Sequence, residues 1–183
     1  MELNLSCPNL EDRGFMFALS AERTAEVTAA ARAASDVPVF TKLSPDVTDL
    51  VTIAEAAVGA GADGLSLINT TLGMAIDTRT FRAKLSTGTG GLSGPAIKPI
   101  AVRCVWQVHR ALPHVPIIGM GGVASVDDAI EMILAGATAV AIGTASFYEP
   151  AAAEQIARGI ADFCETRGIT SLDEIRGQVK EEG

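Results

Sequence analysis

The chain has few aromatic residues, few cysteines and no strongly basic segment. Of its 183 residues, 4% are aromatic and three are cysteines. Those cysteines are too widely spaced for a disulfide framework or a zinc signature. Acidic residues outnumber basic ones by 22 to 14, which gives a net charge of −8, and no lysine and arginine cluster could neutralise a phosphate backbone. These absences argue against nucleic-acid binding, a structural metal and an oxidising compartment.

Long hydrophobic runs are also missing. The longest reach about half of the ~20 residues that a membrane span needs, and the opening Met-Glu-Leu-Asn lacks the basic start of a signal peptide. Apolar residues nevertheless make up 48% of the chain, with a mean hydropathy of +0.31. We therefore expect no membrane contact and a cytoplasmic protein whose single domain has a substantial core.

Short apolar runs alternate with helical patterns along the chain. The runs are continuous or β-branched, as in strands that are buried on both faces, and they cover residues 2–6, 38–43, 64–69, 115–119 and 138–142. Helices are expected over residues 20–34, 48–60, 96–112, 125–135, 150–166 and 171–180. This alternation predicts an α/β fold with a parallel sheet and right-handed crossovers.

The number of strand and helix units is lower than a complete barrel requires. A (β/α)8 TIM barrel needs about 250 residues, and this chain supplies about five units. It is either a small open sheet or a barrel without its N-terminal strands, and we favour the second. Residues 1–183 would then form one partial barrel domain. An additional loop over residues 70–94, rich in threonine and glycine, is of a size that usually serves function.

Two glycine-rich turns follow the last two expected strands. The first contains Gly121 and Gly122, and the second contains Gly143 and Thr144. Glycines at the start of a helix let backbone N–H groups approach an anion, and the loops after the final strands of a (β/α)8 barrel form its usual phosphate site. Ordinary tight turns are the alternative, but two in succession favour a ligand that carries a phosphate.

The first strand ends in a motif that contains the best candidate for a catalytic group. Cys7 comes directly after this strand and before Pro8, with Asn4 and Asn9 on either side. A thiol at the carboxyl end of a parallel strand faces the active side of the sheet, although many free cysteines are simply small buried hydrophobes. The asparagine amides can both donate and accept hydrogen bonds.

Further polar residues lie at the ends of the second and third strands. Lys42 requires either an anionic partner or a path to solvent along its own stem, and Asn69 and Thr70 close the third strand. Neutral amides suit a planar ligand with alternating donors and acceptors, and the lysine and phosphate turns suit a phosphorylated cofactor. Together they indicate redox chemistry on a bound flavin. No metal-ligand signature is present.

Six segments of the chain resemble the dihydroorotate dehydrogenase family, in particular its class 1B, the NAD-linked bacterial type. They are ELNLSCPN, KLSPDVTD, GADGLSLINT, GGLSGPAIKP, VPIIGMGG and AVAIGTA. The resemblance covers nearly the whole chain and implies FMN-dependent oxidation of dihydroorotate to orotate in pyrimidine biosynthesis. It places this chain in the C-terminal portion of such an enzyme, with the N-terminal strands of the barrel absent.

The resemblance also implies a role for individual residues. Cys7 matches the base that removes a proton from dihydroorotate, while Asn4, Asn9, Asn69 and Thr70 match residues that bind the substrate. The matches to the FMN site are Asn4, Lys42, Ile68, Gly94, Gly121, Gly122, Gly143 and Thr144. The segment after Cys7 is similar to the mobile lid of the family, with Gly14 as a hinge.

Partners follow from the resemblance as well. Class 1B enzymes work with an electron-transfer subunit that carries FAD and a 2Fe–2S cluster, and we expect such a partner together with a homo-oligomer. Two rival hypotheses remain open. One is a dihydropyrimidine dehydrogenase-like barrel that acts on uracil or thymine, and the other is an inactive fragment of a flavin enzyme. A sugar-phosphate isomerase or lyase ranks last because it leaves the asparagines unexplained.

Overall fold

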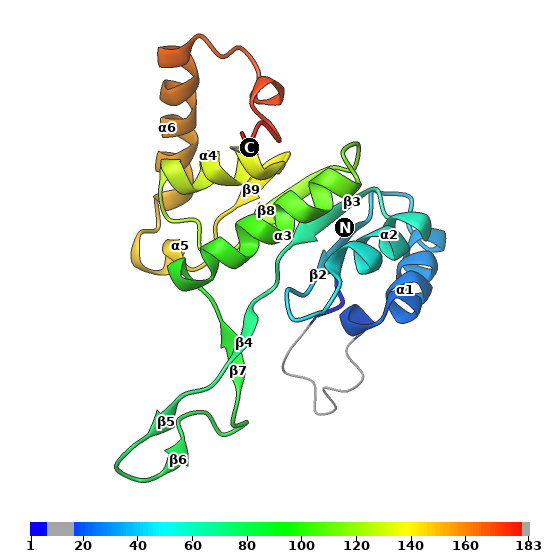
Figure 1. The fold of residues 1–183 in the computed structure, drawn as a ribbon, viewed down its shortest axis with the longest axis vertical. Helices are drawn as coiled ribbons and strands as arrows, with labels where there is room; N and C mark the ends of the chain where they lie inside the picture. Colours follow the sequence, from blue (N-terminus) through cyan, green and yellow to red (C-terminus); the bar gives the residue numbers. More distant parts are fainter. Residues whose placement is uncertain (7–16, 181–183) are drawn as a thin grey trace.

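The central element is a five-stranded parallel sheet in the order β1-β2-β3-β8-β9. The structure, a computed structural model, describes residues 1–6 and 17–180 (Figure 1). The strands are β1 (Glu2–Asn4), β2 (Phe40–Leu43), β3 (Gly64–Leu67), β8 (Ile117–Met120) and β9 (Ala139–Ala141). All five expected strands are therefore confirmed, each shorter than its apolar run because the flanking residues form the loops.

At least one helix comes after each of these strands along the chain. The helices are α1 (Ala21–Ala33), α2 (Leu50–Gly59), α3 (Lys98–Ala111), α4 (Val126–Ala135), α5 (Ala145–Tyr148) and α6 (Ala152–Arg167), with 3₁₀ turns η2 (Phe17–Leu19), η3 (Pro95–Ile97) and η4 (Leu172–Glu174). Ser20 and Asp49 begin α1 and α2 by accepting backbone N–H groups with their side chains. Among the described residues, no helix is long and apolar enough to cross a membrane.

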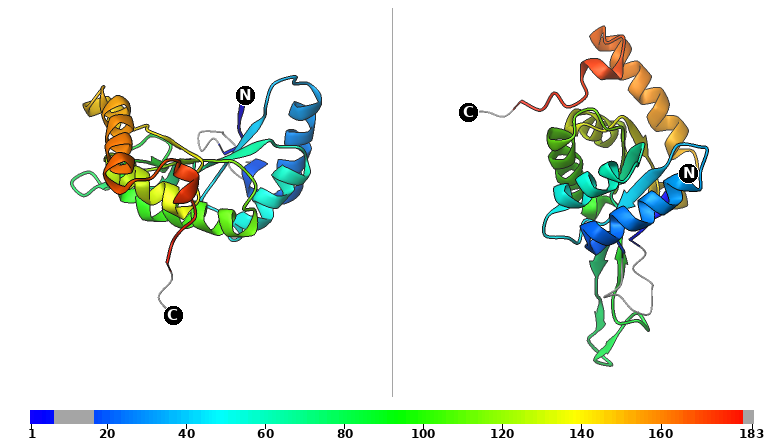
Figure 2. Two further views of the ribbon diagram at one scale, coloured as in Figure 1. Left: turned by 90° about the horizontal axis from the view of Figure 1, so that it is seen from above. Right: turned by 90° about the vertical axis from the view of Figure 1, so that its right-hand side faces the viewer.

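The two faces of the sheet differ in character. Leu65, Leu67 and Ile117 lie on the face that the helices cover, and each is fully buried. The opposite face carries Glu2 and Asn4, which are exposed. Seen from above, the helices form an arc along one side of the curved sheet (Figure 2). The chain thus has the curved sheet and outer helices of part of a (β/α)8 barrel.

The sequence interpretation was wrong about two segments. Residues 171–180 form only the turn η4, which Ser171 and Glu174 close as a capping box, and Gly177 then adopts a positive φ of 71° that interrupts any helix. The additional loop expected over residues 70–94 contains short strands within residues 71–92. They form two antiparallel pairs, β4 (Thr71–Gly73) with β7 (Gly90–Leu92) and β5 (Ile76–Asp77) with β6 (Arg82–Ala83). We call residues 71–92 the arm, because they project from the body (Figure 1).

His109 lies near the end of α3, between two glycines that approach its ring. A Cβ at Gly136 would be 2.2 Å from the ring and one at Gly177 would be 2.4 Å from it, so both the turn after α4 and the C-terminal segment can pack against this ring because they have glycine there. Burial, and to a lesser extent the guanidinium of Arg176, lower the pKa of His109 below its ordinary value of 6.5.

We expect this histidine to make the chain less stable in mild acid. Because its pKa is lowered in the folded state, the unfolded chain binds the proton more readily, and the free energy of unfolding falls as the pH drops below about 6.5. Urea unfolding across this range should show that fall, and His109→Asn should flatten it. His114 is exposed, so His114→Asn is the matched control. An unchanged profile in His109→Asn would contradict this assignment.

Candidate functional site

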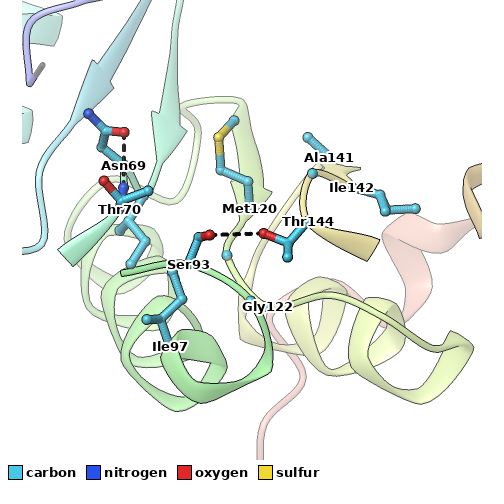
Figure 3. A pocket seen from close by; sticks show the side chains of 13 residues that line it. Asn69, Thr70, Ser93, Ile97, Met120, Gly122, Ala141, Ile142 and Thr144 are labelled. Carbon is cyan, nitrogen blue, oxygen red and sulfur yellow. Dashed lines mark hydrogen bonds between the residues drawn. The ribbon is translucent and has the colours of Figure 1, made fainter. Parts of the chain in front are cut away.

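A cavity of about 210 Å³ opens at the carboxyl ends of β3, β8 and β9 (Figure 3). Its wall combines the loops after these strands with the segment that leads into α3. The lining residues are Ile68, Asn69, Thr70, Ser93, Gly94, Ile97, Met120, Gly121, Gly122, Ala141, Ile142, Gly143 and Thr144. The cavity thus brings together eight residues that the sequence analysis assigned to binding, from four separate segments of the chain.

The loop after β8 fits against the start of α3 only because it consists of glycine. Gly122 has a φ of +80°, and a Cβ there would lie 2.8 Å from the carbonyl oxygen of Gly94 and 2.8 Å from the backbone nitrogen of Lys98. Gly94 itself has a φ of +86°. Two backbone segments therefore meet with no side chain between them, and this contact sets one wall of the cavity.

A cluster of charged groups stabilises this contact on the side that faces away from the cavity. The Lys98 ammonium lies 2.7 Å from Asp128 and 2.5 Å from Glu131, and the other oxygen of Asp128 accepts the Ala124 N–H at 3.0 Å. Burial would raise the pKa of Asp128, yet the ammonium and the backbone donor outweigh it and lower that pKa. Lys98 is thus engaged in joining α3 to α4.

The Asp128 carboxylate has a further role at the start of α4. The spacing of Ser125 and Asp128 predicts a capping box at the start of α4. Ser125 does accept the Asp128 N–H at 3.2 Å, but the Asp128 carboxylate binds the N–H of Ala124, one residue before the cap. The carboxylate therefore anchors the loop that leaves the cavity.

Two hydroxyl groups, those of Ser93 and Thr144, line one end of the cavity. Thr144 Oγ1 donates to Ser93 Oγ at 3.0 Å (Figure 3). Gly143 is adjacent, and a Cβ there would meet nothing within 4 Å, so the backbone borders open space. The sequence analysis missed Ser93, although it lies within GGLSGPAIKP directly before Gly94. Glycine backbone and hydroxyl groups are neutral hydrogen-bond donors that suit a phosphate group.

Asn69 links the cavity to the first strand. Its Nδ2 donates to the carbonyl oxygen of Ser6 and, at 2.8 Å, to Ser6 Oγ. It also approaches Asn4 Oδ1 at 3.5 Å. Its own Oδ1 accepts the Thr70 N–H at 2.9 Å (Figure 3). The structure thereby places Asn4, Asn69 and Thr70 in one hydrogen-bonded network.

Lys42 lies outside this cavity but next to the network, because it pairs in register with Asn4. Its ammonium is 2.8 Å from Glu2 Oε1. Of the two possibilities for Lys42, an anionic partner is the one observed, and this partner is Glu2 of the chain itself, which the sequence pattern did not indicate. Cys7, Asn9 and Gly14 lie outside the described residues. Their roles, like the substrate and flavin roles of the other residues, stay predictions.

Comparison with known proteins identifies the family. Residues 1–164 match the family model described as dihydroorotate dehydrogenase. The chain belongs to the dihydroorotate dehydrogenase family. A catalytic subunit of dihydroorotate dehydrogenase B (NAD(+)) from Geotalea daltonii is 52% identical over 180 residues, and one from Porphyromonas gingivalis is 51% identical over 179. Both alignments cover 98% of this chain.

Solved structures of the family give the same fold. The ligand-free dihydroorotate dehydrogenase of Eimeria tenella superposes with a TM-score of 0.79 at 26% identity, over 99% of this chain and 55% of that one. The chain also spans only 59% of the length of the Geotalea relative. It therefore corresponds to the C-terminal portion of the dihydroorotate dehydrogenase barrel.

We expect Gly122→Ala to disrupt the wall of the cavity. The new Cβ would overlap the Gly94 carbonyl and the Lys98 backbone, and the positive φ adds strain, so the free energy of unfolding should fall by about 1–3 kcal/mol. Chemical denaturation measures this loss. Gly143→Ala is the control, because its Cβ enters open space and should cost no more than about 0.5 kcal/mol. Equal losses in the two variants would contradict the role given to this backbone contact.

Proposed function

We propose that this chain forms the FMN-binding part of an enzyme that oxidises dihydroorotate to orotate in pyrimidine biosynthesis. The observation that carries the proposal is the cavity of glycine backbone and hydroxyl groups beside the Asn69 network, in a chain of the dihydroorotate dehydrogenase family. Residues 1–183 would then be one partial FMN-binding barrel domain, acting in the cytoplasm.

The cavity residues fit FMN because their backbone N–H and hydroxyl groups can donate hydrogen bonds to its phosphate. The terminal phosphate would be held by Gly121, Gly122, Gly143 and Thr144, with Ser93 beside them. The open space next to Gly143 supports this assignment, since a side chain there would occupy it. Following the family resemblance, Ile68 and Gly94 would contact the ring and ribityl chain, and Lys42 would face the ring. When bound, FMN supplies the acceptor for a hydride.

The substrate groups would lie on the same side of the sheet. Asn4, Asn9, Asn69 and Thr70 would orient the pyrimidine and its carboxylate through amide and hydroxyl groups. Cys7 would remove a proton from the substrate. The bonds from Asn69 to Ser6 support this arrangement, because they tie the segment directly before Cys7 to the rim of the cavity.

Two alternatives predict different behaviour. A dihydropyrimidine dehydrogenase-like barrel would use the same flavin and asparagines but would act on uracil or thymine. An inactive fragment would take up no FMN. Both can be distinguished from the proposed function by adding FMN and then each dihydropyrimidine.

Partners can be proposed at two levels. The relatives are named catalytic subunits, and we propose an electron-transfer subunit that carries FAD and a 2Fe–2S cluster as the second component. We also propose that the chain forms a homo-oligomer through the arm. Leu72, Met74 and Ile76 alternate along it and are 48%, 59% and 54% exposed. A two-stranded ribbon alone is marginally stable in water, so a second protein surface would stabilise it.

The charge of the arm favours a second copy as its partner. It contains Arg79, Arg82 and Lys84 against Asp77 alone, whereas the whole chain has a net charge of −8. A second copy would therefore offer an acidic surface to a basic, apolar arm.

The proposed activity is tested by anaerobic titration of the chain with FMN, followed by dihydroorotate. We expect the flavin fluorescence to change on binding and its absorbance to bleach with dihydroorotate but not with dihydrouracil. Gly143→Val should weaken FMN binding by at least about tenfold, because the side chain fills the phosphate end, while Gly59→Val on α2 should not. Cys7→Ser should bind FMN yet bleach far more slowly. Bound FMN that only dihydrouracil reduces would overturn the substrate assignment.

The role of the arm is tested by placing a charge on it. Met74→Glu should shift the sedimentation coefficient from that of an oligomer to that of a monomer, because a buried unpaired carboxylate opposes association. Phe147→Glu is the control, since Phe147 is 91% exposed on α5 and is not part of the arm. If both variants sediment like the unmodified chain, the arm is not the interface.

A further inference from the structure

Next to the Asn69 network lies an ion pair, between Lys42 and Glu2, that neither the cavity nor the sequence motifs explain. Asn4, Lys42 and Ser66 are opposite one another on β1, β2 and β3. Residues opposite one another in a sheet share a face, and so do residues two apart on a strand. Glu2 therefore lies on this same face, one step below Asn4. We call Asn4, Lys42 and Ser66 the polar row. It reaches the candidate site because Asn4 also belongs to the Asn69 network.

The geometry fixes the lysine ammonium against the first strand. Lys42 Nζ donates to Glu2 Oε1 at 2.8 Å, and the side chains are 19% and 38% exposed. A lysine side chain is flexible and strongly hydrated, so an unpaired one would extend into solvent. The contact with Glu2 instead keeps the ammonium over the sheet, against β1.

Ser66 gives a second indication that this row is adapted for polar contacts. Its side chain is completely buried, and its hydroxyl oxygen has no hydrogen-bond partner within the described part of the chain. Burial would raise the pKa of Glu2, yet the hydrogen bond and the charge of the Lys42 ammonium outweigh it and lower that pKa. Glu2 is thus ionised at neutral pH and able to pair with the lysine.

We propose that Glu2 is a positioning residue that holds the Lys42 ammonium at the floor of the flavin site. The inference rests on the proposed function, in which Lys42 faces the flavin ring. Glu2 does not touch the ligand itself. It acts through Lys42, by restricting the side chain to the place from which a cation can stabilise negative charge on a bound ring. Its carboxylate also offsets the lysine charge on a partly buried face.

The first test needs no flavin. The amine reagent trinitrobenzenesulfonate is applied to the purified chain, and labelling of each lysine is followed by peptide mapping. Lys42 should react slowly in the unmodified chain and roughly fivefold faster in Glu2→Ala, the upper range for a partly exposed pair. Glu2→Gln should stay slow, because its amide oxygen still accepts the hydrogen bond. Lys180, exposed and outside the arm, is the internal reference, and Glu22→Ala on α1 is the matched control.

The second test measures FMN affinity by fluorescence in a double-mutant cycle. Glu2→Ala should weaken binding by roughly fivefold, and Glu2→Gln should restore most of it. In the Lys42→Ala background, Glu2→Ala should have no further effect, because its influence passes through the lysine. Additive losses would show that Glu2 acts independently and would overturn the proposal.

The two tests separate this inference from the proposed function. If the unmodified chain takes up no FMN, the proposed function fails while the labelling experiment still decides whether Glu2 holds Lys42. If FMN binds but the labelling rate of Lys42 is the same in Glu2→Ala, the flavin assignment survives and the positioning role is overturned.

Discussion

The parallel pairing of the strands is the constraint on which the rest of the structure depends. Each strand of the sheet runs in the same direction, so the loops that follow β1, β3, β8 and β9 all leave from one edge. Residues that are far apart in the sequence, such as Asn4, Asn69 and Thr144, therefore lie at the same edge of the sheet. The helices on the other face only have to bury aliphatic side chains, which leaves the edge free for polar groups.

At this edge, close backbone contact replaces side-chain packing. The loop of Gly121 and Gly122 lies directly on the segment from Gly94 to Lys98, and the ion pairs from Lys98 to α4 stabilise it from the far side. Rigidity therefore comes from the glycine backbone of the wall and from ion pairs that do not face the cavity. The groups that do face it, including Ser93 and Thr144, are small and can be oriented by a neighbour. The rigid backbone and the ion pairs therefore allow a site to be built from small side chains.

Sequence patterns predict features that depend on local chemistry, and they fail where distant segments decide. The strands and long helices follow from runs of apolar residues, and the glycines of the cavity from their positions after strands. The arm was missed because its short strands pair only with each other and contain Gly73, Gly90 and Gly91. The Glu2–Lys42 pair was missed because nothing in the sequence indicates that residues 40 apart share one face. Ser93 lies within the motif GGLSGPAIKP, but a single serine does not by itself indicate a binding role.

The neutral lining of the cavity has a consequence for how ligand binding would respond to solution conditions. Its lining residues, all within the described ranges, include no group that ionises near neutral pH. The protein side of a phosphate contact would then keep the same protonation state throughout that range. A change in the strength of these particular contacts with pH would then originate in the ligand, whose phosphate has a second ionisation near pH ~6. Such a site recognises the anion by its shape and by oriented dipoles. The pH dependence of these contacts would follow the ionisation of the ligand's phosphate.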